Sequence, residues 1–570
     1  MSEAATLGSS RSARSPAIAW LARNAPLVCL GAAMAVSAVL LIALGSHLTL
    51  YADEWNMVLW RRGTSAAAFL DPYNQHLVVG VVLVYKGLLA TFGMDSPVPF
   101  HVISTLFYLL AAGLLFAYVR RRVGDWLALL GTGLILFLGS AAEDLLFPFQ
   151  IFFSGSIAAG LGALLALDRD DRRWDLLACA LIVVSMSFSE VGIAFSVGAL
   201  VRVMLGSRPW PSRLYLPLAP LVLYGLWWLV WGHTGHSHVS LHNAAATPLY
   251  VIDAVGGGLG ALTGLASASD QPGGAAGQQW VPVLLAAAVV LAAWRLIRMG
   301  RVPVGVWPVL AIGLVFWVLA GLSYMPGREA ATNRYLYPSG VFVLLIAAEL
   351  LRGVRPGGRA LVAAACATAF AIGANLVFLS DSYKDLWKPR SQLIRADLTA
   401  LEVGGPLNPS FVLTGEVSRA PYFDIGTRDY LSAVQAWGSP AYTQSELASA
   451  PEAARAEADK VLGAMLGLTL RHGGPVQGVC RNVNAAPTAW KEVPLAPGAV
   501  SVQPHGTTAA KVALGRFADE LPVDAGRVAP GSAATLSIPR DAAPPPWRIG
   551  VQGEGRVTLC GPALAQASAA

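Results

Sequence analysis

The stretch that decides the fold is residues 25–55, which read APLVCLGAAMAVSAVLLIALGSHLTL and then YADEW. Its first part carries no acidic or basic residue other than His47 and exceeds the roughly 20 residues that a helix needs to cross a bilayer core. Arg11, Arg14 and Arg23 precede it, but the apolar run is too long for a signal-peptide core of about 7–15 residues. We therefore predict an uncleaved first transmembrane helix.

The composition extends this reading to most of the chain. Hydrophobic residues make up 55% of it, charged residues only 13%, and the mean hydropathy is +0.55. An ordinary soluble domain has about 25% charged residues, without apolar blocks of membrane-spanning length. The sequence predicts an all-α polytopic membrane protein with about eleven spans, at 25–50, 100–119, 126–142, 147–167, 176–188, 191–205, 214–231, 280–294, 302–325, 335–351 and 360–379.

The arginines between these blocks predict the orientation. The net charge is +6, but the cations form short clusters on one side, which is typical of cytoplasmic loops and gives no reason to expect nucleic acid binding. With residues 1–24 as a cytoplasmic tail, the inner loops hold Arg120–Arg122, Arg169/Arg172/Arg173, Arg208/Arg213, Arg295/Arg298/Arg301 and Arg352/Arg355/Arg359. The outer loops between helices hold only Arg61, Arg62, Lys86, Arg328 and Arg334.

Three segments are assigned by keeping this charge asymmetry. Residues 76–93 are predicted as an interfacial helix within a long first outer loop, 51–99, because a span there would place Arg120–Arg122 outside. Residues 248–267, rich in glycine, are predicted to lie along the surface. Residues 176–205 are predicted to be two short helices that meet at Ser189-Glu190, because a single helix would invert every later loop.

Residues 25–380 therefore form the predicted membrane domain, and residues 381–570 an extracytoplasmic α+β domain. We expect residues 391–468 to be mostly helical and residues 500–561 to form a small β-sandwich, because short alternating runs are separated there by turn residues. Cys480 and Cys560 are the only cysteines in this domain. They fit a disulfide in an oxidising compartment, and two unpaired buried thiols are the alternative.

Charged residues gather where the predicted helices reach the outer side. Carboxylates follow three of them: Asp53-Glu54, Glu143-Asp144 and Glu190. Cations come from the segment PGREAATNRYLYP at 326–338, which contains Arg328 and Arg334. Carboxylates and arginines at one depth predict a cavity for an anionic substrate, and structural ion pairs are the competing explanation.

At these residues the chain resembles the GT-C superfamily of membrane glycosyltransferases. The resemblance covers about residues 20–380 and rests on the acidic pair in the first outer loop, the second acidic pair after the third span, and Asn-Arg-Tyr-x-Tyr-Pro entering a late span. It implies a sugar donor carried on polyprenyl phosphate and a reaction on the outer face. The layout, with an outer β-rich domain, is similar to that of bacterial cell-wall arabinosyltransferases. The chain departs from the pattern in lacking Asp-x-Asp in the predicted outer loops between helices and in having Gln75-His76 where some relatives carry an acidic–His–Arg pattern.

The residue types fit this chemistry. A lipid phosphate leaves as an anion, so one carboxylate base and cations for the phosphate suffice. The resemblance implies Asp53 as the base, with Glu54 in support. Arg334 and Arg328 would hold the phosphate by forked donation. Substrate-binding roles are further predicted for Glu143, Asp144, Glu190, Tyr335 and His76. No residue is assigned as a metal ligand, and the use of Mg or Mn is left open.

The function predicted from the sequence is transfer of a hexosyl or pentosyl group from a polyprenyl-phosphate donor to a cell-envelope glycan, lipid or protein in a bacterial plasma membrane. The alternatives are a lipid or glycan transporter and a non-catalytic scaffold that displays its outer domain. A transporter typically shows internal repeats and charges near the midplane. No repeat is evident here, and the charges lie at the outer rim, which favours an enzyme.

Overall fold

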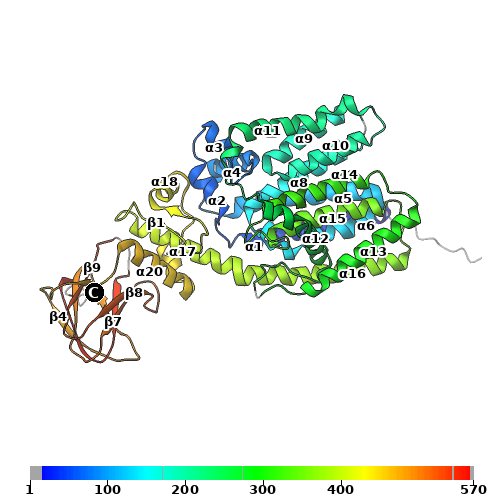
Figure 1. Cartoon of the computed structure of the whole chain (residues 1–570). Coiled ribbons are helices and arrows are strands. Elements are labelled where there is room, and N and C mark those ends of the chain that lie inside the picture. Colours follow the sequence, from blue (N-terminus) through cyan, green and yellow to red (C-terminus); the bar gives the residue numbers. More distant parts are fainter. Residues whose placement is uncertain (1–15, 170, 273, 542–544, 565–570) are drawn as a thin grey trace, which may run out of the picture.

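The computed structural model describes residues 16–169, 171–272, 274–541 and 545–564; residues 1–15 of the predicted tail, with Arg11 and Arg14, lie outside them. A bundle of helices is followed by a smaller α+β part that protrudes from one end (Figure 1). The bundle helices are α1 Pro16–Gly45, α5 Val98–Val123, α6 Asp125–Leu136, α7 Ala142–Leu146, α8 Ile151–Leu167, α9 Arg172–Phe188, α10 Val191–Met204, α11 Tyr215–Val230, α12 Leu241–Thr263, α13 Val281–Met299, α14 Val306–Leu322, α15 Asn333–Leu350 and α16 Gly358–Ser382.

These helices make the chain a multi-pass membrane protein. Within the described residues, seven helical stretches are long and apolar enough to cross a membrane: Asn24–Gly45, Val98–Val123, Asp125–Leu146, Pro148–Leu167, Leu241–Thr263, Gln278–Met299 and Gly358–Gly404. Four shorter apolar helices are Val79–Phe92, Val191–Met204, Tyr215–Val230 and Val306–Leu322. Helices satisfy their own backbone hydrogen bonds, which is the requirement for a segment surrounded by lipid. The total of eleven spans and their orientation stay predictions.

The three ambiguous segments all contain helices. Helices α9 and α10 are separate, because Ser189 adopts an extended backbone (φ −163°, ψ 158°) that interrupts the helical hydrogen bonds. The helix within 76–93 is α4 Val79–Phe92. The segment 248–267 is part of a longer helix than expected, α12, which packs against α13, α14 and α15 and has the length and composition of a span. Its placement along the surface stays a prediction.

The first outer loop folds over one end of the bundle as four short elements, which Figure 1 shows beside α18. They are α2 Asp53–Trp55, a π-helical turn η1 Asn56–Trp60, α3 Ala66–Leu70 and the helix α4. Arg61 ties this loop together, since its guanidinium donates to the side chain of Asn56 (3.1 Å) and to the carbonyl of Asp71 (2.7 Å). The loop is therefore ordered at this end of the bundle.

The connection from the bundle to the α+β part, which we call the outer part after its predicted place, is continuous helix. Helix α16 passes through a π-helical turn, η7 Tyr383–Trp387, directly into α17 Lys388–Gly404. Helices α18 Thr427–Trp437, α19 Gln444–Ala448 and α20 Glu452–Leu466 follow, together with the two-stranded pair β1 Val412–Leu413 and β2 Ile425–Gly426. The loop between β1 and β2 turns back onto the membrane part, because the Ala52 amide donates to the Pro421 carbonyl (3.1 Å).

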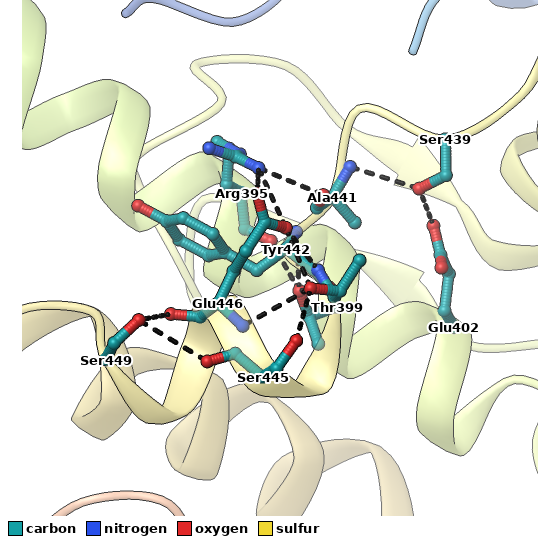
Figure 2. A network of polar contacts seen from close by, with 10 residues as sticks. Arg395, Thr399, Glu402, Ser439, Ala441, Tyr442, Ser445, Glu446 and Ser449 are labelled. Atoms are coloured by element: carbon teal, nitrogen blue, oxygen red, sulfur yellow. Dashed lines mark hydrogen bonds and ion pairs between the residues drawn. The ribbon is translucent and has the colours of Figure 1, made fainter.

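Polar contacts hold α17 against the segment that follows α18 (Figure 2). The hydroxyl of Thr399 donates to the Tyr442 carbonyl and accepts from the Tyr442 amide, both at 3.0 Å. Thr443 and Glu446 form a capping box at the start of α19, which satisfies two otherwise unpaired amides. Ser439 donates to Glu402 of α17. This network fixes the outer helices, and with them the β1–β2 loop, relative to the long helix.

The C-terminal region is β-rich, as the alternating sequence predicts. One sheet has the strand order β5-β10-β7-β8 and the other β3-β9-β6-β11-β4. Their bounds are β3 Arg471–His472, β4 Cys480–Ala485, β5 Lys491–Leu495, β6 Gly498–Pro504, β7 Ala510–Gly515, β8 Val523–Val528, β9 Ala534–Ile538, β10 Trp547–Gln552 and β11 Gly555–Cys560. Every strand pair is antiparallel. A sandwich packing of the two sheets stays a prediction.

The predicted disulfide joins Cys480 and Cys560, which face each other in the register of β4 and β11. It closes a loop across a sequence separation of 80 residues. A cross-link over a long loop removes much conformational freedom from the unfolded chain.

We therefore expect both thiols to resist alkylation until reductant is added. Reduction should lower the free energy of unfolding of the β-rich region by about 2–5 kcal/mol, measured on the full chain by proteolytic protection of that region. Cys179, which is partly buried in the membrane part, serves as the control for access of the reagent. Full labelling of Cys480 and Cys560 before reduction would rule the bridge out.

The orientation is tested by reporter fusions. Fusions after Arg122, Arg173, Arg301 and Arg359 should report cytoplasm, and a fusion after Ser380 should report the far side, because the arginine clusters are retained inside. An outward signal after Arg122 would make α4 a true span. The first loop would then need a different placement.

Candidate functional site

A cavity of about 460 Å³ lies where the first outer loop, the starts of α10 and α15, the end of α14 and the β1–β2 loop come together. It brings together residues far apart in the sequence. Six of the residues singled out from the sequence line it: Asp53, His76, Glu190, Arg328, Arg334 and Tyr335. Much of the remaining wall is aromatic or aliphatic, including Phe149, Phe152, Phe153, Phe316, Leu319 and Leu322.

Asp53 enters the cavity from a strained turn after α1. The preceding Ala52 has φ 43° and ψ −114°, a conformation that is costly for a residue with a side chain. Among the described residues, three other than glycine have positive φ: Ala52, Asn74 and Tyr422. Asn74 and Tyr422 line the cavity, and Ala52 directly precedes Asp53. Strain of this kind collects at functional sites, where the surrounding structure holds it in place.

The Asp53 carboxylate has one engaged and one open oxygen. The Tyr73 hydroxyl donates to Oδ1, whereas Oδ2 has no hydrogen-bond partner among the described residues. Burial raises the pKa of Asp53; the Tyr73 hydrogen bond and the charges of Arg334 and Arg328 oppose that rise. An oriented carboxylate with a raised pKa and one free oxygen is suited to accept a proton.

Glu54 does not line the cavity. It is 1% exposed, and its carboxylate accepts from the Tyr85 hydroxyl (2.6 Å) and the Tyr51 amide (2.9 Å). Burial raises the pKa of Glu54 to about 8, so the group is mostly protonated at neutral pH. Consecutive helical residues point about 100° apart, which turns Glu54 away from the cavity that Asp53 faces. Its role in the structure is to hold the turn.

The two residues of the second acidic pair, Glu143 and Asp144, also point in different directions. Glu143 forms an ion pair with Arg334 (Nε–Oε1 3.3 Å) and accepts from the Gln150 amide (3.0 Å). Asp144 points into the interior, is 4% exposed, and neither of its oxygens has a hydrogen-bond partner within the described residues. Consecutive residues of a helix point about 100° apart, so of the two only Glu143 reaches Arg334. Neither residue is among those that line the cavity, and their substrate-binding roles stay predictions.

Arg334 lies on a well-anchored helix start, and Arg328 lies in the loop before it. Asp270 accepts from the backbone and side-chain amides of Asn333 (2.8 and 2.9 Å), and Asn333 accepts from the Ala142 amide (3.1 Å). This fixes the first turn of α15, from which Arg334 projects into the cavity. The two terminal nitrogens of Arg334 make no hydrogen bond in the described part of the chain, and Arg328 has no ion pair there. Both guanidinium groups are available to an anion.

His76 and Glu190 form an ion pair on the same cavity, with Nδ1 and Oε2 2.8 Å apart. The break between α9 and α10 places Glu190 there, since it is the first residue after the extended Ser189. Tyr335 lies beside Phe153 and Phe316, with ring centroids 6.3 and 6.4 Å apart. These contacts complete one wall.

Several lining residues were missed from the sequence. Tyr73, which orients Asp53, sits in a loop without a distinctive motif. Tyr422 and Phe423 come from the outer part, more than 350 residues after Asp53 in the numbering; no local signal links them to the cavity. Among the described residues, no group of three or more His, Cys, Asp or Glu side chains is arranged to hold a metal ion.

Comparison with known proteins gives a likeness to solved structures. No protein-family model matches the chain, and no curated protein sequence matches it. A solved structure that is similar is the crystal structure of ArnT from Cupriavidus metallidurans bound to undecaprenyl phosphate, with 14% identity, a TM-score of 0.44, and coverage of 72% of this chain and 85% of that one. Every residue role proposed for this chain rests on the geometry of its own cavity.

Proposed function

We propose that this protein is a membrane glycosyltransferase that moves a sugar from a polyprenyl-phosphate donor to a cell-envelope acceptor on the outer face of the membrane. The observation that carries the proposal is one cavity that combines the open oxygen of Asp53, the guanidinium group of Arg328, the terminal nitrogens of Arg334 that its ion pair with Glu143 leaves open, and a long apolar wall. These are the three elements that the reaction needs: a base, an anion site and a surface for an isoprenoid chain.

The transfer is a single displacement. The acceptor hydroxyl attacks the anomeric carbon of the sugar as its proton passes to Oδ2 of Asp53. The bond between that carbon and the phosphate oxygen breaks, and polyprenyl phosphate leaves as an anion. Arg334 and Arg328 stabilise the charge that grows on the phosphate, which is why no general acid is required. Asp53 then returns its proton to water.

The two ends of the donor suit different parts of the cavity. Its phosphate fits beside Arg334 at the start of α15 and Arg328 in the loop before it. Its isoprenoid chain fits along the apolar residues at the end of α14, Phe316, Leu319, Ala320 and Leu322. The orientation that this requires, with the cavity on the outer side, follows the predicted distribution of arginines. The acceptor approaches under the β1–β2 loop, where Tyr422 offers an exposed aromatic ring.

The function is tested by incubating the purified protein with a panel of radiolabelled polyprenyl-phosphate hexoses and pentoses and envelope extracts, and by measuring the mass of any product. Transfer of label to a larger product supports the proposal. A second arm adds EDTA: we expect turnover to persist, because two arginines supply the positive charge beside the phosphate. Movement of intact donor across vesicles without transfer would instead favour a transporter.

A pH prediction follows from the surroundings of Asp53. The base must be ionised, so turnover should fall as the pH drops through its pKa, which burial raises above the ordinary value of about 3.9. The Tyr73 hydrogen bond lowers that pKa, so Tyr73→Phe should move the acidic limb of the profile to higher pH. The measurement is kcat/KM as a function of pH for both proteins. A limb that moves to lower pH, or not at all, would show that Asp53 is not the titrating base.

A further inference from the structure

A second cavity, of about 580 Å³, lies at the opposite ends of the helices that build the first. Helices α8, α10 and α15 each contribute to both, through their first residues or the turn before them at one cavity and their last residues at the other. On α15 the first cavity is lined by Arg334 and the second by Glu349, fifteen positions later. That distance corresponds to about 22 Å of helix. The second cavity is therefore separate from the proposed active site.

The floor of this cavity is a buried ion cluster. Arg122 contacts Glu349 and donates to both carboxylate oxygens of Asp168 at 3.2 Å. The side chains of Arg122 and Glu349 are only 4% and 1% exposed. The Tyr118 hydroxyl donates to Glu349 (2.8 Å). Removing such charges from water is costly, and the cluster persists because its members compensate one another. The charge of Arg122 is thus compensated by Glu349 and Asp168 within the protein.

Three other arginines line the cavity, and nearby carboxylates compensate their charge less completely. Arg202 lies 4.0 Å from the nearest oxygen of Asp168, which Arg122 already occupies. Arg352 is 3.4 Å from Glu349, and its side chain is 53% exposed. Arg301 has no ion pair or hydrogen bond in the part of the chain that the structure describes. Four arginines thus face two carboxylates across one cavity, which leaves an excess of positive charge.

The rest of the wall is apolar and includes Leu164, Leu167, Met299, Val302, Val304 and Pro308. We propose that this cavity is a binding site for a phosphate-bearing anion, and specifically for the headgroup of an anionic phospholipid. The phosphate lies among Arg202, Arg301 and Arg352, where guanidinium groups donate in pairs to its oxygens. The apolar residues contact the glycerol backbone and the start of the acyl chains. Basic pockets between membrane helices are suited to such headgroups.

Occupation of the site should stabilise the protein, because a ligand that binds only the folded state raises the free energy of unfolding. The experiment uses the full chain, delipidated in detergent, with native mass spectrometry and thermal unfolding as readouts. The probes are phosphatidylglycerol, phosphatidylcholine and soluble glycerol phosphate. We expect retention of phosphatidylglycerol and a rise in Tm, with little effect from phosphatidylcholine.

The matched variants are Arg301→Gln, which lines the cavity, and Arg359→Gln, an exposed arginine at the start of α16 that does not line it. Arg301→Gln should weaken phosphatidylglycerol binding roughly tenfold or more, as expected for loss of a charged phosphate contact. Arg359→Gln should leave it unchanged. Arg301 is exposed and makes no hydrogen bond or ion pair with the described residues, so the variant should unfold at the same temperature without lipid.

Three outcomes would overturn the proposal. Equal retention of phosphatidylglycerol and phosphatidylcholine would show that the site does not recognise the charge of the headgroup. Equal losses in Arg301→Gln and Arg359→Gln would show general attraction to a basic surface. Stabilisation by glycerol phosphate with no further gain from the lipid would assign the site to a soluble phosphate ester and reject the phospholipid.

Discussion

Replacement of Asp53 by asparagine should lower the turnover number by about 10²–10⁴-fold, the usual contribution of a general base. The amide keeps the size of the side chain and can still accept from the Tyr73 hydroxyl, so the turn after α1 should fold. It cannot take up the proton of the acceptor. Donor affinity should therefore change little while kcat collapses. The measurement is single-turnover transfer from a labelled donor together with equilibrium binding of that donor.

Glu54→Gln is the matched control for Asp53→Asn. Glu54 is adjacent in sequence but lies outside the cavity, and burial raises its pKa to about 8, so the amide resembles the state already present at neutral pH. We expect turnover within a few-fold of the unchanged protein. If Asp53→Asn retained transfer while Glu143→Gln abolished it, the base would belong to the second acidic pair. If no carboxylate variant changed any transfer, the enzyme proposal would fail.

Arg334→Lys should reduce donor affinity even though the charge is kept, because lysine cannot donate through two parallel N–H groups. Arg334→Gln should reduce it further, roughly 10–100-fold, in line with a hydrogen bond to a charged group. The rate should fall as well, since the same contacts stabilise the charge that develops on the leaving phosphate. Binding of labelled donor and single-turnover rates measure the two effects.

Loss of Arg334 also leaves Glu143 without its ion-pair partner, which by itself destabilises a protein. The double variant Arg334→Gln/Glu143→Gln removes both charges and controls for this. If it regains stability but not donor binding, the arginine acts on the donor directly. Unchanged donor binding in Arg334→Gln would move the anion site to Arg328.

The membrane part was predictable because its signals are local and strong. An apolar block of sufficient length predicts a transmembrane helix whatever the tertiary contacts of that segment are. The break at Ser189-Glu190 was predicted from the charge asymmetry of the loops. Charges at helix ends share one depth, so Asp53, Glu190 and Arg334 could be grouped before their contacts were known. Their roles as base and anion ligand stay predictions.

The sequence did not predict the directions of individual side chains or the contacts between segments that lie far apart in the chain. The 3₁₀ turn Gly139–Ala141 precedes α7, and the direction of that helix places Glu143 rather than Asp144 beside Arg334. The sequence did not predict the full extent of α12, whose glycines permit close packing against its neighbours. They lie against Ala331, Leu336 and Ser339. Tyr422 reaches the cavity only through the tertiary arrangement of the outer part.

The β1–β2 loop gives the protein a built-in order of completion during its synthesis. When the last membrane helix has been inserted, Asp53 and both arginines are in place, but the wall that Tyr422 and Phe423 provide has not yet been translated. The contact between the Ala52 amide and the Pro421 carbonyl, which holds the strained turn beside Asp53, is also still missing. A chain that ends before Tyr422 would thus have an unfinished cavity. Folding of the part that follows α16 is the step that completes it.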